Sequence, residues 1–347
     1  MEMARLTARR IALAAMIFTA VTLGATLLAS SASSWWVGDL AVHFRLQYAA
    51  AALIELLVLG WARRWVWTAA ALAALVVNGV AAASLLGGGS VIRGAVAGAP
   101  PVISDSGSPA RTGVRGARRR HVGSGSPHEP LRIASINVLF HNRHYDRVEA
   151  FLRSARPDAA VLVEITPAWR AALGSLREEF PWQYYAESRD SHGTLLLSRW
   201  PFEHTETVPM GPHADPTIAA VLNVRGRALH LIGVHPAWPI GPAVSAERNR
   251  ELSRLAALAR ATPAPLVMAG DFNLTPFSPH FRAFVAQSGL QWTARGAGWQ
   301  PTWPTFLPVG GIQIDHAFVS PGIDVRRFAR GPGIGSDHRP IVVDLDW

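Results

Sequence analysis

The segment Met268-Ala-Gly-Asp-Phe-Asn273 follows an apolar run, and the segment Ser336-Asp-His-Arg-Pro340 precedes another. We expect both segments at the edges of buried strands. Residues two apart on an extended chain point to the same side, so Asp271 and Asn273 present their side chains together. The neighbours Asp337 and His338 place a hard oxygen ligand beside a titratable nitrogen. The two segments therefore predict phosphate chemistry assisted by a metal ion.

The chain divides into an apolar N-terminal part and a C-terminal part of short strands and helices. Of its 347 residues, 49% are hydrophobic and 16% are charged, and the long Ala, Leu and Val runs precede residue 131. We predict a transmembrane region over residues 1–86, a flexible linker rich in Gly, Ser, Pro and Arg over 87–130, and a catalytic domain over 131–347. The chain has no Cys, which excludes disulfides, thiolate metal sites and Cys nucleophiles.

The net charge of +9 is concentrated before the predicted catalytic domain. Residues 1–130 carry 12 Arg and 5 acidic residues, whereas residues 131–347 carry 21 Arg and 19 acidic residues. A protein that binds many phosphates of a nucleic acid needs a basic surface. Charge therefore gives no reason to assign the nearly neutral C-terminal domain to nucleic acid.

Three apolar segments are long enough to cross the hydrocarbon core of a membrane, about 30 Å thick. They are Ile11–Ser30, Leu46–Ala62 and Trp65–Leu86. Glu55, in the second segment, is either an ion or lipid contact or a partner of a neighbouring helix or protomer, because a charge inside a membrane is costly.

Arginines set the expected orientation. Arg5, Arg9 and Arg10 precede the first segment and Arg63-Arg64 follow the second. The positive-inside rule places both groups in the cytoplasm, so three spans put the catalytic domain on the extracytoplasmic side of the cell or inner membrane. Arginines after the third segment oppose this, but their main cluster lies beyond the range of the rule. A cleaved signal peptide at the first segment would leave the domain outside as well.

Period-2 and short apolar runs predict strands at 132–140, 159–164, 193–198, 217–224, 228–234, 265–269, 314–319 and 341–345. Helical periodicity predicts helices at 145–154, 167–179, 243–261 and 279–287. Several strands follow one another without a helix. This order predicts an α+β domain with mixed or antiparallel sheets that pack face to face under helices.

Polar residues recur at the ends of these strands. A single Asp there is usually a turn or cap residue, but a series within one domain favours a functional site. Glu164 directly follows the buried run Val161-Leu-Val163, so it needs a metal ion or an Arg as its partner. Asn137 could complete that shell or be a core amide. The series is Asn137, Glu164, His235, Asp271, Asn273, Asp315, Asp337 and His338.

These segments resemble the endonuclease/exonuclease/phosphatase superfamily of metal-dependent phosphoesterases. The resemblance covers about residues 131–347 and keeps the family order of motifs. The matching segments are Ser-Ile-Asn-Val at 135–138, Val-Glu-Ile at 163–165, Gly-Val-His-Pro at 233–236, Gly-Asp-Phe-Asn at 270–273, Ile-Asp-His at 314–316 and Ser-Asp-His-Arg-Pro at 336–340.

The resemblance implies a four-layer α/β sandwich and a Mg²⁺ or Mn²⁺ cofactor. The implied metal site consists of Glu164 with Asn137 and Asp337. The implied catalytic residues are Asp271, which positions or deprotonates water, Asn273, which orients water and phosphate, His235, which contacts a phosphoryl oxygen, His338, which stabilises developing charge, and Asp315, which fixes the tautomer of His338. Oxygen ligands suit Mg²⁺, and donors around a phosphate offset negative charge.

Four further residues are candidates: His316, Trp238, Trp303 and His192. We expect His316 to be a core ring rather than a site residue. Trp238 and Trp303 could wall the cleft and stack on a base or a sugar, or they could pack within loops.

The leading hypothesis is a membrane-tethered, metal-dependent phosphodiesterase or nuclease. One alternative is a phosphatase of the same fold that acts on lipid headgroups or phosphomonoesters. Another is a non-catalytic membrane binding module. The expected partners are a phosphoester substrate, either nucleic acid, phospholipid or a small phosphate ester, and the lipid bilayer; the sequence identifies no protein partner.

Overall fold

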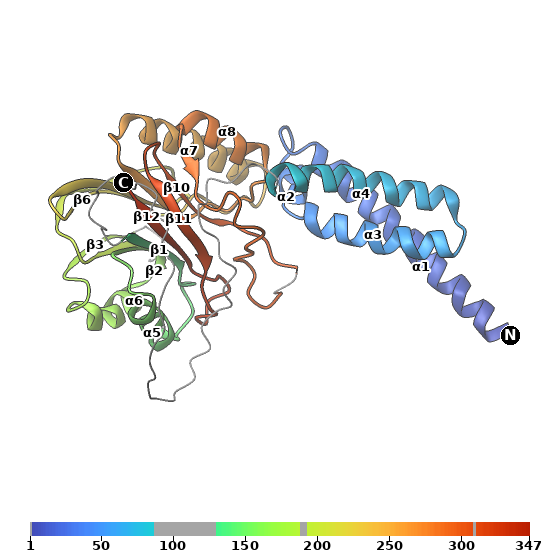
Figure 1. Ribbon diagram of the computed structural model, residues 1–347, viewed down its shortest axis with the longest axis horizontal. Coiled ribbons are helices and arrows are strands. Elements are labelled where there is room, and N and C mark those ends of the chain that lie inside the picture. Colours follow the sequence, from blue (N-terminus) through green and yellow to red (C-terminus); the bar gives the residue numbers. More distant parts are fainter. Residues whose placement is uncertain (1, 87–129, 188–192, 308–309) are drawn as a thin grey trace, which may run out of the picture.

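The computed structural model describes residues 2–86, 130–187, 193–307 and 310–347. An elongated helical bundle extends from a domain in which helices flank two β-sheets (Figure 1). Nearly all of the expected linker over residues 87–130 lies outside the described residues.

The bundle has four helices where the sequence predicted three. Helices α1 (Glu2–Ser30) and α4 (Trp65–Leu86) are each long and apolar enough to cross a membrane. Between them, α2 (Trp36–Val42) and α3 (Arg45–Trp61) meet at an angle of 66°. The described part of the chain thus has two candidate spans, or three if the bent pair is one span.

The expected second span, Leu46–Ala62, coincides with α3 to within one residue at each end. The 17 residues of α3 extend for about 26 Å, which is less than the hydrocarbon core of a bilayer. The short helix α2, which the sequence did not predict, precedes α3 across a bend at His43 and Phe44.

Polar side chains inside the bundle bond to neighbouring helices. The hydroxyl of Thr22 on α1 donates to Glu55 Oε1 on α3 at 2.7 Å. Asn78 on α4 donates to Thr26 Oγ1 on α1 at 2.8 Å and accepts from Arg45 Nη1 at 3.2 Å. Glu55 therefore faces α1, which agrees with the helix-partner reading of this buried carboxylate.

The domain that begins at β1 contains two mixed sheets of six strands. The first has the order β11-β12-β1-β2-β4-β3, and the second has the order β5-β6-β7-β8-β10-β9. The strands are β1 (Leu131–Asn137), β2 (Ala159–Ile165), β3 (Trp182–Glu187), β4 (Gly193–Ser198), β5 (Phe202–Val208), β6 (Thr217–Val224), β7 (Arg227–Val234), β8 (Leu266–Asp271), β9 (Gln291–Trp292), β10 (Asp315–Val319), β11 (Asp324–Arg330) and β12 (Ile341–Asp346).

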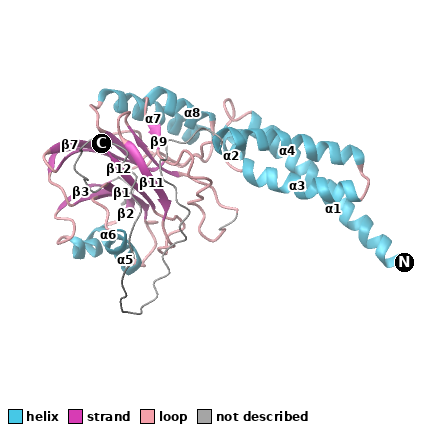
Figure 2. Cartoon of the chain, viewed as in Figure 1, coloured by secondary structure: helices cyan, strands magenta, loops and turns pink. Residues whose placement is uncertain are grey.

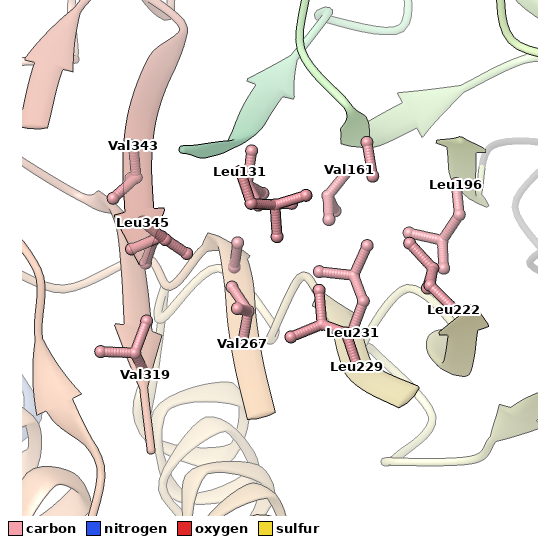
Figure 3. Packing of buried hydrophobic residues seen from close by; sticks show 14 of the residues in the cluster. Leu131, Val161, Leu196, Leu222, Leu229, Leu231, Val267, Val319, Val343 and Leu345 are labelled. Atoms are coloured by element: carbon pink, nitrogen blue, oxygen red, sulfur yellow. The ribbon is translucent and has the colours of Figure 1, made fainter. Parts of the chain in front are cut away.

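The domain has four layers, as expected. Aliphatic side chains from both sheets fill the space between them, including Val161, Leu231 and Val343 (Figure 3). Apolar residues of the helices cover the outer face of each sheet, and Figure 2 shows the helices outside the strands. The first sheet is covered by α5 (Tyr145–Ala155), α6 (Pro167–Ala172) and the 3₁₀ helix η1 (Leu173–Leu176), and the second by α7 (Pro242–Ala261) and α8 (Pro279–Ser288).

Two parallel strand pairs bring the polar strand ends together. Strands β1 and β2 are parallel, and so are β7 and β8, so the carboxyl ends of each pair lie side by side. Strand β10 runs antiparallel to β8, with its first residue, Asp315, opposite Asp271. Strand β12 runs antiparallel to β1, which places the segment before it at the same edge.

Gly270 allows β8 to approach β7 closely, and its replacement by Ala should lower stability. A Cβ at Gly270 would lie 1.8 Å from the carbonyl oxygen of Val234, so the backbone would have to move. We expect Gly270→Ala to cost about 1–3 kcal/mol. Thermal unfolding of the full chain in detergent, followed by Trp fluorescence, measures this as a midpoint lower by roughly 2–4 °C for each kcal/mol.

Gly174→Ala is the matched control, because a Cβ there has no heavy atom within 4 Å. Equal midpoints for the two variants would contradict the proposed contact between β7 and β8.

Candidate active site

The carboxylate of Asp271 lies at the centre of the polar strand ends. Its Oδ2 accepts a hydrogen bond from Asn137 Nδ2 at 3.1 Å. The same oxygen lies 3.7 Å from His235 Nε2 and 3.6 Å from His338 Nε2. Its Oδ1 accepts from the backbone N–H of Asn273 at 2.9 Å. Asp271 is only 1% exposed, and the nitrogen atoms of these four residues surround its carboxylate.

Glu164 lies beside this centre because of an irregular backbone. The pairing of β2 with β4 shifts between Leu162 and Ile165, and Glu164 has φ 62°. Such a positive φ costs a non-Gly residue of order 1–3 kcal/mol, and residues held in this way cluster at functional sites. The Glu164 carboxylate accepts from Asn137 Nδ2 at 2.8 Å and from the backbone N–H of Phe140 at 3.0 Å. Asn137 therefore joins the carboxylates of Glu164 and Asp271.

Each site histidine is held by a carboxylate through Nδ1. His338 Nδ1 lies 2.9 Å from Asp315 Oδ2, and His235 Nδ1 lies 2.8 Å from Asp215 Oδ2. Such a bond fixes the orientation of the ring and directs Nε2 toward Asp271.

Sequence reasoning missed Asp215. This residue precedes β6 instead of following a strand, but β6 runs antiparallel to β7, so the start of one meets the end of the other. The backbone N–H of Asp215 donates to the carbonyl of His235 at 3.1 Å. The segment His213-Ala-Asp-Pro216 before an apolar strand was the available signal, but only strand pairing connects it with His235.

The carboxylates keep both imidazoles protonated at neutral pH. Burial by itself lowers the pKa of His338, but Asp315 and Asp271 outweigh it and raise that pKa to about 10. Burial also lowers the pKa of His235, while its bond to Asp215 and the nearby carboxylates raise it to about 9. Burial raises the pKa of Asp271 to about 6, although the two imidazoles act in the opposite direction. The site thus places two cations on either side of one carboxylate.

The remaining expected residues, Asn273 and Asp337, lie in loops at the same edge. Asn273 has φ 53°, and its Nδ2 donates to the carbonyl of Pro236 at 3.0 Å. Asp337 Oδ2 accepts from the indole N–H of Trp303 at 2.9 Å, and its Oδ1 is buried with no hydrogen-bond partner among the described residues.

Six of the eight expected site residues line a cavity of about 620 Å³. Its polar part contains Glu164, His235, Asp271, Asn273, Asp337 and His338. None of the described residues that line it is Arg, and the chain contains no Lys. Carboxylate oxygens of this cavity that lack a hydrogen-bond partner therefore cannot pair with an Arg or a Lys of the lining.

The donor set fits a hard divalent cation. The ligand atoms of Asp271, Asp315 and His338 lie within 4.8 Å of one another. However, Asp315 and His338 bond to each other, and Asp315 does not line the cavity. Glu164 and Asp337 do line it, and the unpartnered Oδ1 of Asp337 is available for a ligand. Oxygen donors of this kind suit Mg²⁺ or Mn²⁺.

A model of the Endonuclease/Exonuclease/phosphatase family matches residues 134–338. The chain belongs to this family. Its members are phosphoester hydrolases that depend on divalent metal ions, and the carboxylates of Glu164 and Asp337 on the cavity of this chain agree with that chemistry.

Solved structures show the same fold. A humanized D. rerio TDP2 has a TM-score of 0.53 and 20% identity, over 62% of this chain and 99% of that one. The endonuclease/exonuclease/phosphatase of Bacteroides vulgatus has a TM-score of 0.55 and 18% identity, over 63% and 99%. That of Beutenbergia cavernae has a TM-score of 0.53 and 20% identity, over 63% and 72%. No curated protein sequence matches the chain.

The aromatic candidates separate into core and cavity residues. His316 is fully buried among Phe side chains, accepts from the Trp292 indole at 3.1 Å and lies 2.9 Å from the carbonyl of Leu274. This agrees with the core reading for His316. Trp238 and Trp303 line the cavity. His192 lies outside the described residues.

A second feature that sequence reasoning missed joins the helical bundle to the site. Arg248 on α7 is fully buried and forms an ion pair with Asp39 on α2. The same guanidinium donates to the carbonyl of Asn273 at 3.2 Å. Asp39 Oδ1 also accepts from Ser278 Oγ at 2.7 Å, and His43 Nδ1 lies 3.0 Å from Thr275 Oγ1. Helix α2 and the residue after it therefore hold the loop that follows Asp271.

Breaking this buried ion pair should weaken both stability and activity. In Asp39→Asn the Arg248 charge stays buried without a carboxylate, which costs about 3–5 kcal/mol. The Asn273 loop also loses part of its support, so we expect kcat to fall at least fivefold. Thermal unfolding and initial rates of the full chain measure the two effects.

Asp346→Asn is the control, because its partner Arg326 is 53% exposed and such pairs contribute about 1 kcal/mol or less. Indistinguishable midpoints for the two variants would show that the contact with α2 does not support the domain.

Proposed function

We propose that the protein is a membrane-anchored phosphodiesterase that uses Mg²⁺ or Mn²⁺ and whose catalytic domain lies outside the cytoplasm. The observation that carries this proposal is the convergence of two carboxylate-held histidines, Asp271 and further carboxylates on one cavity. Nothing in the described site favours the non-catalytic alternative, since each expected polar residue is present.

The metal ion would be held by Glu164 and Asp337, with Asn137 orienting the Glu164 carboxylate. When bound, such an ion polarises a phosphoryl oxygen and offsets negative charge on it. Trp303 fixes one oxygen of Asp337 and leaves the other for the ligand.

The other residues would handle the attacking water and the phosphoryl group. Asp271 lies between the imidazoles of His235 and His338, where it can orient a water molecule and accept its proton. The two histidines use Nδ1 for their carboxylates, so Nε2–H of each can donate to phosphate oxygens. Fixed donors of this kind stabilise the charge that develops in the transition state. Asn273 would orient the water and the phosphate.

The membrane arrangement rests on the distribution of arginines along the bundle. The N-terminus lies at the end of the bundle far from the catalytic domain (Figure 1), as do the first residues of α1 and the turn between α3 and α4. Arg9, Arg10, Arg63 and Arg64 therefore gather at that end, which the positive-inside rule assigns to the cytoplasm.

Removal of the metal or of its ligands should abolish hydrolysis. We expect EDTA to stop cleavage of bis-p-nitrophenyl phosphate by the purified full chain, and Mg²⁺ or Mn²⁺ to restore it. The double variant Glu164→Ala/Asp271→Ala should lose at least a thousandfold in kcat, because it removes a ligand and the water-orienting carboxylate. Release of p-nitrophenol measures both.

Glu206→Ala on the exposed face of β5 is the control for the loss of a carboxylate. Hydrolysis that persists in EDTA, or in the double variant, would rule out the proposed mechanism.

The proposed orientation predicts where a C-terminal reporter is active. Alkaline phosphatase, which folds only in an oxidising compartment, should be active when fused after Trp347, whereas green fluorescent protein at the same position should remain dark after export through the Sec pathway. The reverse pattern would place the catalytic domain in the cytoplasm.

A further inference from the structure

The catalytic cavity has a wall that comes from the helical bundle. Leu40 on α2, together with His43 and Phe44 between α2 and α3, lines the same cavity as Asp271 and His235. We infer that the substrate is a lipid phosphoester, held with its phosphate at Asp271 and its apolar portion along this wall. The inference rests on the proposed hydrolase function and names the substrate class of that site.

The cavity has a polar floor, formed by the residues around Asp271, and an apolar rim. An amphiphilic ligand, with a polar headgroup and an apolar chain, matches this arrangement. Three large apolar side chains at the rim are strongly exposed: Phe140 at 48%, Trp238 at 63% and Ile240 at 51%. Exposed apolar residues that gather around a polar site mark a surface for an apolar ligand or a membrane. A small hydrophilic phosphate ester would leave the exposed side chains of Trp238 and Ile240 in water.

The wall lies at the end of the bundle that meets the domain, where the expected membrane helix α3 begins. Figure 1 shows α2 at the junction between the bundle and the catalytic domain, and α3 begins at Arg45, directly after Phe44. Gln47, in the first turn of α3, donates to the carbonyls of Gly310 and Gly311 at 2.8 Å and 3.0 Å. The polar floor is thus close to the expected surface of the bilayer.

Exposed apolar residues close to Gly310 and Gly311, the residues that Gln47 binds, also indicate where the bilayer surface lies. Phe306 and Leu307, which precede Gly310 and Gly311, are 76% and 48% exposed. Trp35, before α2, is exposed as well. Exposed apolar and aromatic side chains at the end of the bundle that meets the domain suit the interface between water and lipid.

The wall is fixed relative to the catalytic residues. Asp39, next to Leu40, forms a buried ion pair with Arg248, which also bonds to the Asn273 carbonyl. His43, itself a wall residue, bonds to Thr275 in the loop after Asn273. The bundle therefore completes the substrate cavity instead of serving as a simple tether.

Nucleic acid fits this cavity less well than a lipid. His235 and His338 can serve the reacting phosphate, but strong binding of a polyphosphate chain needs cationic side chains for the neighbouring phosphates as well. None of the described lining residues is Arg, and the chain has no Lys. Hydrolysis of DNA or RNA remains the competing outcome in the experiment below.

The experiment compares alkyl p-nitrophenyl phosphates that differ only in the alkyl group. The full chain in nanodiscs is assayed with methyl, butyl and octyl probes, each below its aggregation threshold, and with plasmid DNA and RNA. A buried methylene contributes up to about 0.8 kcal/mol, or about fourfold in affinity. We therefore expect kcat/KM to rise at least tenfold from the methyl to the octyl probe.

Variants at the wall (Phe44) and at the rim (Ile240) separate binding of the alkyl group in the cavity from its partition into the nanodisc. Phe44→Ser and Ile240→Ser should each reduce the octyl-to-methyl ratio of kcat/KM at least threefold, although the nanodisc is unchanged. Ile240 lies in an exposed loop, so its variant keeps the test independent of helix packing. Leu53→Ser on α3 and Trp182→Ser on β3 are controls, because these exposed residues do not line the cavity.

The outcomes distinguish the two proposals. Metal-dependent hydrolysis without dependence on chain length, or with equal loss in the wall and control variants, would overturn the lipid inference and leave the hydrolase proposal intact. Faster cleavage of plasmid or RNA than of the octyl probe would identify a nuclease and overturn it too. Failure of every substrate with Mg²⁺ and Mn²⁺ would instead contradict the proposed function.

Discussion

Asp271 lies almost fully buried where the carboxyl ends of two parallel strand pairs meet. A buried carboxylate without partners would be strongly destabilising. The surrounding structure supplies an amide from Asn137, a backbone N–H from Asn273 and two imidazoles, His235 and His338. Because those imidazoles are themselves buried, each depends on a further carboxylate. Compensation of the buried Asp271 carboxylate thus involves residues from both sheets.

The same edge also contains irregular backbone. Glu164 and Asn273 have positive φ, and β2 departs from regular pairing at Glu164. A regular strand directs successive side chains to opposite faces, so a bulge is a means of re-aiming one of them. Gly270 contributes in another way, since the absence of Cβ lets β8 lie against the backbone of β7. Local strain and close packing are offset by the well-filled core between the sheets.

The helical bundle is connected to this site through the loop after Asp271. Asp39 and His43 contact Arg248 and Thr275 across more than 200 residues of sequence. A charge pair buried at such a junction has one favourable geometry, since displacement leaves both charges unpaired. This contact makes the orientation of the two-sheet domain on the bundle part of the geometry of the candidate active site.

The sequence by itself determined the strand-end polar residues, the apolar helices and the order of the family motifs, because these depend on local composition and periodicity. It did not determine the edge strands: exposed residues weaken the apolar pattern in β3, β5 and β11, and β9 has only two residues. Pairing of Asp215 with His235 required the register of β6 on β7, and pairing of Asp39 with Arg248 required the docking of two regions. Such contacts are decided by tertiary structure because no local property of either residue specifies its distant partner.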